Sequence, residues 1–422
     1  MVLEVKFAIR LVRFKNGETY YMLTRADTRM PLYYPTLFAT TQIRNNSKSS
    51  ATIAANLVAI KIFMNWCVAH RLDLESRLSQ HQFLTLVEIE SLSRYTQFAS
   101  DKTRTENRKN RLVSRPNVRE RARTEIRNRE ASVNGNTQYI RLTYIAYYLK
   151  WLSETIIERD AKRISPNDAT SIQKMIENIL ARRHKKSNRS LINTRRGLDE
   201  SQREELLRIT TPDVEDNPFQ EPSVRLRNEL IVLMLYHLGV RDGELLNIRI
   251  ADIDFQQHTL LVARRPDDPD DPRAYQPKVK TMDRLIPLRD TLVAKITRYI
   301  TEHRRQYPTA RRHDYLFVTH KAGPSCGMPL SLAHVQKMFR QIRKSSPDKL
   351  SNLSAHVLRH TWNDRFSELA DTQEMATATE EKTRSFLMGW KEGSGTASTY
   401  TRRHTERKGH EAALKLQNNL KE

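Results

Sequence analysis

The chain opens with alternating apolar and polar positions. Leu3, Val5 and Phe7 alternate with charged residues, and Asn16-Gly17 follows as a typical hairpin turn. An alternation with period two is the pattern of a strand that has one face buried. Residues 1–35 are therefore predicted to form a β-hairpin.

The apolar spacing becomes helical from Thr52 onwards. Ile53, Leu57 and Ile60 recur at intervals of three and four, with Ser49 or Ser50 as the N-cap. Further helical segments are expected near residues 84–95 and 139–157. We therefore predict a helical domain over residues 36–181.

Two segments lack any apolar period. Residues 101–129 carry Arg or Lys at about every third position and almost no apolar residue, so they cannot bury a core. Residues 182–197 are polar and basic and are predicted to be an interdomain linker.

A second domain is predicted over residues 198–422, with Asp199 as the N-cap of its first helix. The fold class is mainly α with a small antiparallel β-sheet (α+β). The strands are expected at 253–255, 260–262 and 284–288, and the main helices at 228–238, 332–345, 356–370, 382–389 and 406–420.

Charge then narrows the class of partner. The 422 residues include 72 Lys and Arg against 49 Asp and Glu, which gives a net charge of +23. Such a surplus favours a polyanionic partner, which is nucleic acid or an anionic membrane face. The sequence has no run of 18 apolar residues and no signal-peptide pattern, so we expect a soluble, cytoplasmic protein.

With nucleic acid as the expected partner, two segments each keep two interpretations. The N-terminal hairpin is either an edge ribbon packed on its own domain or an arm that contacts DNA. The segment 101–129 is either a solvated insertion or a loop that contacts phosphates. Its composition does not distinguish the two.

The first candidate for chemistry is Arg241 with Glu244. A buried helix is expected to end at Gly239, and Arg241 then begins the next helix, where a guanidinium beside backbone N–H groups suits an anion. Glu244 would orient it. Taken alone, the pair fits an ordinary salt bridge at a helix start better, because Arg–Glu pairing is common there.

The second candidate is a helix face that carries His356, Arg359 and His360. Positions i, i+3 and i+4 share one face, so the two imidazoles and the guanidinium converge. Zinc binding is one interpretation, but Val357 stands where a zinc protease has Glu, and the arginine repels a dication. A phosphate fits better; an ordinary surface helix remains the alternative.

Further candidates lie in a turn and near the C-terminus. Lys278, Lys280 and Arg284 surround a turn that leads into a strand. Tyr400 becomes a nucleophile only if an electropositive setting favours loss of its phenolic proton. Arg402 and Arg403 could supply this electropositive setting, and Trp390 lies in the motif before the tyrosine.

In combination, these motifs resemble the active site of the tyrosine recombinase (phage integrase) family. The order is Arg241, Lys280, His356-x-x-Arg359, Trp390 and Tyr400, with Glu244, His360 and Lys278 close by. Two features depart from the family pattern: Trp390 replaces the usual His, and the spacing to Tyr400 is one residue longer. Lys280 is preferred over Lys278 because Thr281 follows it.

The resemblance implies strand transfer without metal, ATP or any other cofactor. Tyr400 would attack a phosphodiester, Arg241 and Arg359 would hold its oxygens, and Lys280 would protonate the leaving 5′-oxygen. In the same scheme His356 is the general base, while Trp390, Glu244 and His360 support the site. Lys278, Arg284, Arg402 and Arg403 are assigned to DNA binding.

The resemblance also implies an assembly. Two domains would form a C-shaped clamp on double-stranded DNA. A tetramer, organised as a dimer of dimers, would exchange strands through a Holliday junction. An accessory DNA-bending factor would be a further partner. The terminal helix would either cover its own domain or dock on a neighbouring subunit. Alternatives are a type IB topoisomerase-like enzyme and a catalytically silent DNA-binding protein of the same fold.

Overall fold

The computed structural model forms two compact units, Met1–Leu191 and Ile192–Glu422, which we describe separately. The division falls within the segment predicted as a linker. The described residues are 6–98, 132–161, 163–184, 197–265, 268–273, 275–277, 279, 281–393, 395, 397, 400, 409 and 412–417.

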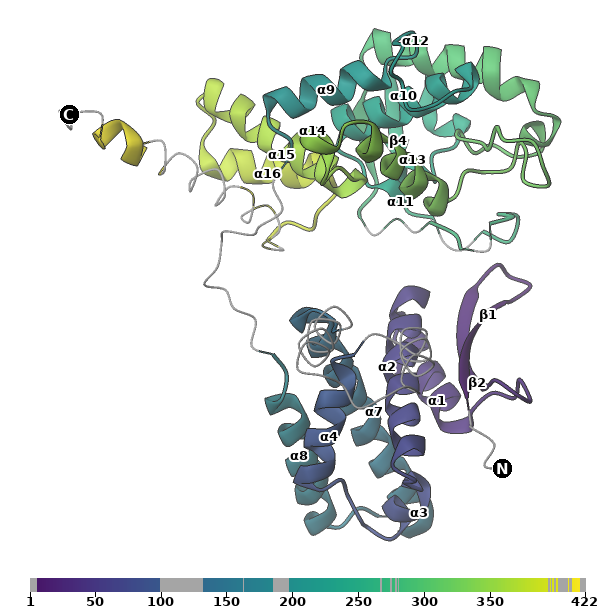
Figure 1. The fold of residues 1–422 in the computed structure, drawn as a ribbon, viewed down its shortest axis with the longest axis vertical. Coiled ribbons are helices and arrows are strands. Elements are labelled where there is room, and N and C mark those ends of the chain that lie inside the picture. The colour runs from purple at the N-terminus through teal and green to yellow at the C-terminus, as the bar shows by residue number, and fades with distance from the viewer. Residues whose placement is uncertain are drawn as a thin grey trace, which may run out of the picture. The chain divides into compact units, whose positions relative to one another are not determined.

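Unit 1 is a helical bundle with a β-hairpin on one side (Figure 1). The strands are β1 (Phe7–Arg13) and β2 (Thr19–Arg25), and the shorter helices include α1 (Tyr33–Phe38), α3 (Leu74–Ser79) and the π-helical Ala39–Arg44. The longer helices are α2 (Ser50–Ala69), α4 (Leu86–Thr96), α7 (Gly135–Ala161) and α8 (Pro166–Ala181).

The predicted hairpin is confirmed, and it packs on its own unit. Strands β1 and β2 pair antiparallel from Phe7 opposite Arg25 to Arg13 opposite Thr19. Phe7, Tyr20 and Leu23 are buried in the same core as α2 and α7. The interpretation as an edge ribbon therefore holds for the inner face of the hairpin.

Helix α2 is the core helix of unit 1. The Ser49 side chain caps it by accepting from Thr52 N, as its sequence predicted. By length and mean hydropathy (1.5) it is also the single described helix that could cross a membrane. Half of that window is buried inside unit 1, with Trp66 fully enclosed, which is the environment of a core helix.

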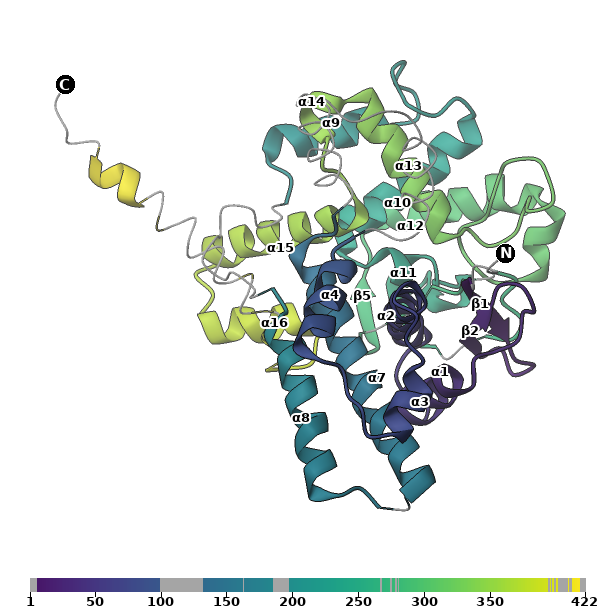
Figure 2. The same ribbon diagram turned by 60° about the horizontal axis from the view of Figure 1, so that its bottom comes forward.

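Unit 2 is mainly helical and contains a three-stranded antiparallel sheet (Figure 2). The sheet has the order β3 (Ile253–Asp254), β4 (Thr259–Val262), β5 (Arg284–Pro287). The helices are α9 (Glu200–Thr210), α10 (Pro222–Leu238), α11 (Asp242–Leu245), α12 (Asp290–Arg298), α13 (Leu332–Ser345), α14 (Pro347–Leu350), α15 (Ala355–Thr372) and α16 (Thr377–Met388).

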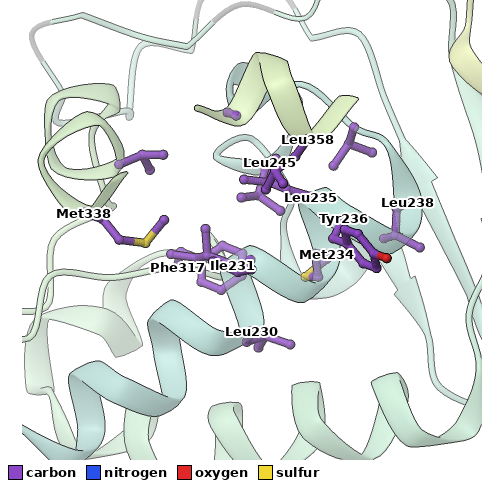
Figure 3. Packing of buried hydrophobic residues seen from close by; sticks show 14 of the residues in the cluster. Leu230, Ile231, Met234, Leu235, Tyr236, Leu238, Leu245, Phe317, Met338 and Leu358 are labelled. Atoms are coloured by element: carbon purple, nitrogen blue, oxygen red, sulfur yellow. The ribbon is translucent and has the colours of Figure 1, made fainter. Parts of the chain in front are cut away.

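The core of unit 2 forms around α10. In Figure 3, Ile231 and Leu235 of α10 lie among Leu245 of α11, Phe317 and Leu358 of α15. All five side chains are at most 2% exposed. Because burial of apolar surface is the main favourable term in folding, this cluster fixes where α11 and α15 begin, and these helix starts carry candidate residues.

Several sequence predictions concern residues outside the described part of the chain. These are the segment 101–129, most of the linker, Lys278, Lys280, Arg402 and Arg403. The predicted terminal helix is described only at residues 409 and 412–417, which are helical and exposed.

Candidate active site

The candidate site is built around one buried carboxylate, Glu244 in α11, which is 1% exposed. Its Oε1 accepts from Arg241 Nη1 at 2.9 Å and from Thr281 Oγ1 at 2.9 Å. Its Oε2 accepts from Arg284 Nη2 at 2.7 Å. A buried charge is tolerated only when it is paired and hydrogen bonded, and Glu244 satisfies both conditions.

The surrounding arginines keep Glu244 ionised. Burial by itself would raise the pKa of this carboxyl, but the charges of Arg284, Arg359 and Arg241 and the hydrogen bond from Arg284 outweigh burial and lower the pKa to about 2. Glu244 is thus a carboxylate throughout the physiological range. It offsets part of the positive charge that three guanidinium groups bring to one place.

Arg241 occupies the N-cap of α11, as predicted. Its side chain is 33% exposed, so the guanidinium reaches the surface while Glu244 holds one edge of it. The sharp turn before it uses Gly239 at φ +62°, where a Cβ would meet Trp362 Cγ at 2.7 Å. Only glycine fits both this left-handed backbone and this packing.

Arg359 in α15 is the buried counterpart of Arg241. It is 2% exposed, and it donates to Gly239 O at 2.6 Å and to Met388 O at 3.1 Å. Burial and the nearby charge of Arg241 lower the pKa of this guanidinium to about 9, so it remains protonated at neutral pH. Arg359 therefore adds a fixed positive charge.

His356 and His360 lie one turn apart on α15, as the helix spacing predicted. Their ring centroids are 4.4 Å apart, and His360 lies 5.5 Å from the Tyr400 ring. Among the described residues no group of three or more His, Cys, Asp or Glu side chains could hold a metal ion. The zinc interpretation thus lacks a third ligand in this part of the chain.

Trp390 and Tyr400 stack on each other. Their ring centroids are 5.4 Å apart and the planes are inclined by 12°. Arg359 also lies over the Trp390 ring, 5.4 Å from its centroid. Trp390 Nε1 is buried and has no hydrogen-bond partner among the described residues, which leaves a donor available for a ligand oxygen.

One predicted role is wrong in this structure. Arg284 was expected to contact DNA, but it is 4% exposed. Its guanidinium donates to Glu244, to Thr281 Oγ1 at 3.1 Å and to Leu387 O at 2.8 Å. Because these contacts occupy it below the surface, Arg284 supports the site from inside.

Sequence reasoning also missed residues behind the site. Asn363 donates to Arg359 O at 2.8 Å, and the fully buried Arg384 donates to Asn363 O at 2.9 Å. Thr281, used only to choose between two lysines, joins Glu244 to Arg284. A polar residue inside an amphipathic helix gives no sign in the sequence that it faces inward.

Together these contacts form one continuous group. Arg241 contacts Glu244, Glu244 lies 3.9 Å from Arg359, and Arg359 lies over the ring that stacks on Tyr400. Two cations, an indole N–H and two imidazoles thus belong to one group of contacts with the Tyr400 phenol. This set is suited to hold an anionic tetrahedral or pentavalent centre next to an oxygen nucleophile.

Comparison with known proteins finds relatives of this chain. The model of the phage integrase family matches residues 196–407. Transposase A from transposon Tn554 of Staphylococcus aureus is 32% identical over 135 residues, covering 32% of this chain and 34% of the transposase. Tyrosine recombinase XerA of Pyrococcus horikoshii is 27% identical over 137 residues, covering 32% of this chain and 40% of XerA.

Solved structures were compared as well. The crystal structure of XerA recombinase is 17% identical, with 87% of this chain and 92% of that chain covered and a TM-score of 0.35. XerH recombinase bound to palindromic difH substrate is 14% identical, with 90% and 93% covered and a TM-score of 0.41.

The aligned region thus spans about a third of the length of the transposase. The family match covers half of the present chain and includes Arg241, Glu244, the α15 motif, Trp390 and Tyr400. On this match, the chain belongs to the phage integrase family.

Proposed function

We propose that the chain is a site-specific DNA recombinase that cleaves and rejoins strands through Tyr400. The observation that carries the proposal is the continuous group from Arg241 through Glu244 and Arg359 to the Trp390–Tyr400 stack. Through these contacts it connects a nucleophile with two cations that suit the oxygens of a phosphodiester.

In the proposed reaction, Tyr400 Oη forms a bond to the phosphorus while the bond from phosphorus to the 5′-oxygen breaks. His356 accepts the phenolic proton, and Lys280 gives a proton to the leaving oxygen. Arg241 and Arg359 hold the non-bridging oxygens, and the unpartnered Trp390 N–H donates to one of them. The products are a 3′-phosphotyrosine and a free 5′-hydroxyl.

The reverse reaction completes the exchange. A 5′-hydroxyl from a second duplex attacks the phosphotyrosine and releases Tyr400. Exchange of both pairs of strands in this way passes through a Holliday junction. The phosphotyrosine conserves the energy of the broken bond, so we propose that no ATP is consumed. We also propose that the reaction requires no metal ion.

We further propose an assembly for this reaction. The partner is double-stranded DNA, which both units bind as a clamp. The active assembly is a tetramer of this chain. It works in the cytoplasm, and an accessory DNA-bending factor assists it. Lys278, Arg402 and Arg403 are proposed to contact phosphates.

Covalent trapping tests this function. Wild type, Tyr400→Phe and Arg241→Ala are incubated in EDTA with nicked duplexes tiled from DNA that flanks the gene, and the products are run on a denaturing gel. We expect a protein–DNA band with wild type only, because the variants lack the nucleophile or a phosphate clamp.

Three results would contradict the proposal. A band that persists in Tyr400→Phe would place the nucleophile elsewhere. Tight, salt-sensitive binding without a band on any duplex, even with host extract, would favour the catalytically silent DNA-binding protein. Relaxation of supercoiled DNA without a required sequence would instead indicate the topoisomerase-like enzyme.

A further inference from the structure

The long connection between β4 and β5 is held to the helix that carries Arg241. This connection, residues 263–283, contains both candidate lysines, and its described parts make buried polar contacts on either side of them. Such contacts are unusual in a surface turn, because each polar group must be stripped of water and satisfied again.

The first attachment is a buried ion pair. Asp271 and Arg273 are 1% and 7% exposed, and Arg273 Nη2 lies 2.7 Å from Asp271 Oδ2. The same guanidinium donates to Leu246 O at 2.9 Å and to Leu330 O at 3.2 Å. It also lies 4.4 Å from the centroid of the Tyr315 ring, so protein groups contact both the polar edge and a face of Arg273.

Asn247 continues this attachment towards the lysines. Its Oδ1 accepts from Arg273 Nη2 at 3.2 Å, and its Nδ2 donates to Pro277 O, the residue before Lys278. On the far side, Thr281 directly follows Lys280 and donates to Glu244 at 2.9 Å. Val279, between the lysines, is 6% exposed.

Both flanks of the lysine segment therefore end on residues 244–247. Glu244 and Leu245 end α11, Leu246 and Asn247 follow it, and Arg241 is the N-cap residue directly before α11. A short rigid helix thus joins the residues beside the lysines to the residue proposed to clamp the phosphate. Movement of either flank would change the lysine position relative to Arg241.

We propose that Arg273 is a positioning residue for proton donation to the leaving oxygen. It would act by fixing the flank of the lysine segment against Leu246 and Asn247, without touching DNA. This inference rests on the proposed function, in which Lys280 protonates the 5′-oxygen. An error of about 1 Å in such a group is enough to slow catalysis by on the order of a hundredfold.

The test uses two leaving groups. Nicked duplexes carry either the ordinary 5′-oxygen or a 5′-bridging sulfur at the cleaved bond, and a thiolate leaves without being protonated. With Arg273→Ala we expect cleavage of the oxygen substrate to fall by roughly 10–100-fold. Cleavage of the sulfur substrate should stay within about threefold of wild type, and Arg273→Lys should recover part of the loss.

Two further variants control for folding. Arg227→Ala removes another buried arginine of unit 2, 8% exposed and bonded to Val318 O at 3.0 Å, and should affect both substrates equally. Asn247→Ala leaves the Asp271–Arg273 pair intact and should show a milder defect that sulfur also restores. It carries the test if Arg273→Ala does not fold.

The outcomes separate this inference from the proposed function. Equal losses on both substrates, or no loss on either, in Arg273→Ala and Asn247→Ala would overturn the positioning role. Lys280→Ala serves as the reference. If the sulfur substrate restores cleavage neither by Lys280→Ala nor by Lys278→Ala, the proposed proton donation itself is wrong. If sulfur restores Lys280→Ala alone, only the role of Arg273 fails.

Discussion

Glu244 is the residue on which the candidate site depends most. Its two oxygens hold Arg241, Arg284 and Thr281, and it lies 3.9 Å from Arg359. Removing one partner from a buried group of charges leaves the others uncompensated, which costs more than the net value of the pairing. The residue therefore controls both the stability of unit 2 and the geometry of the arginines.

Replacement of this carboxylate should give a pH-dependent loss of stability. The pKa of Glu244 is lowered to about 2 from a usual 4.5, so its contribution is present above pH 4.5 and disappears as the pH falls towards 2. We expect Glu244→Gln to lower the free energy of unfolding by roughly 3 kcal/mol at pH 7.

Urea unfolding at pH 7 and at pH 3 measures this difference. The gap between wild type and variant should narrow at pH 3, because below pH 4.5 the unfolded wild-type chain binds a proton at Glu244 that folding must release, whereas the amide of the variant does not titrate. A gap of the same size at both pH values would mean that the ionised form of Glu244 is not what stabilises the fold.

At this scale the sequence predicts local partners well and distant ones poorly. Glu244 stands three positions after Arg241, and helical geometry alone brings the two together. Arg284 is forty positions further on, and a basic residue at a strand start is usually solvated. Its burial follows from the pairing of β4 with β5, a tertiary contact that no local pattern encodes.

The end of α16 connects this helix to the strand that bears Arg284. Gly389 ends α16 at φ +63°, and its carbonyl accepts from Met282 N at 3.0 Å. A Cβ at this position would meet Arg284 Nη1 at 2.8 Å and Met282 O at 2.9 Å. The glycine thus permits a close approach of two elements that both support the site.

Gly389→Ala should therefore lower the free energy of unfolding by more than the backbone strain alone. A left-handed alanine costs about 1–2 kcal/mol, and the clash with Arg284 should add about 1–3 kcal/mol. Gly393→Ala is the matched control, since Gly393 has φ +72° but nothing within 4 Å of the added methyl. If thermal unfolding shows equal losses of stability for Gly389→Ala and Gly393→Ala, the close approach makes no contribution to stability.

Elements with a strong apolar period were predicted most accurately. The prediction for residues 332–345 coincides with α13, and the three strands of unit 2 are confirmed to within two residues. Helix α12 was missed, although Leu292, Val293 and Ile296 are buried on one face of it. The π-helical turns at Ala39–Arg44 and Tyr299–His303 depend on packing and leave no repeat in the sequence.

For the molecule as a whole, the C-terminal segment is the feature that bears on assembly. Residues 412–417 are helical and exposed, with Leu414 at 50% and Leu416 at 81%. Of the two interpretations for this helix, docking on another subunit requires such exposure. The sequence predicted apolar positions here, but not which surface covers them.

Deletion of residues 411–422 should weaken pairing of DNA sites while sparing binding to a single site. The reason is that exposed apolar side chains gain most from burial against a partner. Gel shifts with one-site and two-site DNA measure both properties. Assembly on paired sites that equals wild type would refute the docking role.

The stacking of Tyr400 on Trp390 has an optical consequence. An indole emits differently when a phenol covers its face than when water reaches it, so departure of the tyrosine in the proposed strand cleavage should change the fluorescence of this tryptophan. The chain has four tryptophans, and with the other three, Trp66, Trp151 and Trp362, replaced by phenylalanine, Trp390 becomes a single emitter. The stack is thus an internal reporter of the moment when the nucleophile leaves its resting position, readable in a stopped-flow cell without any added dye.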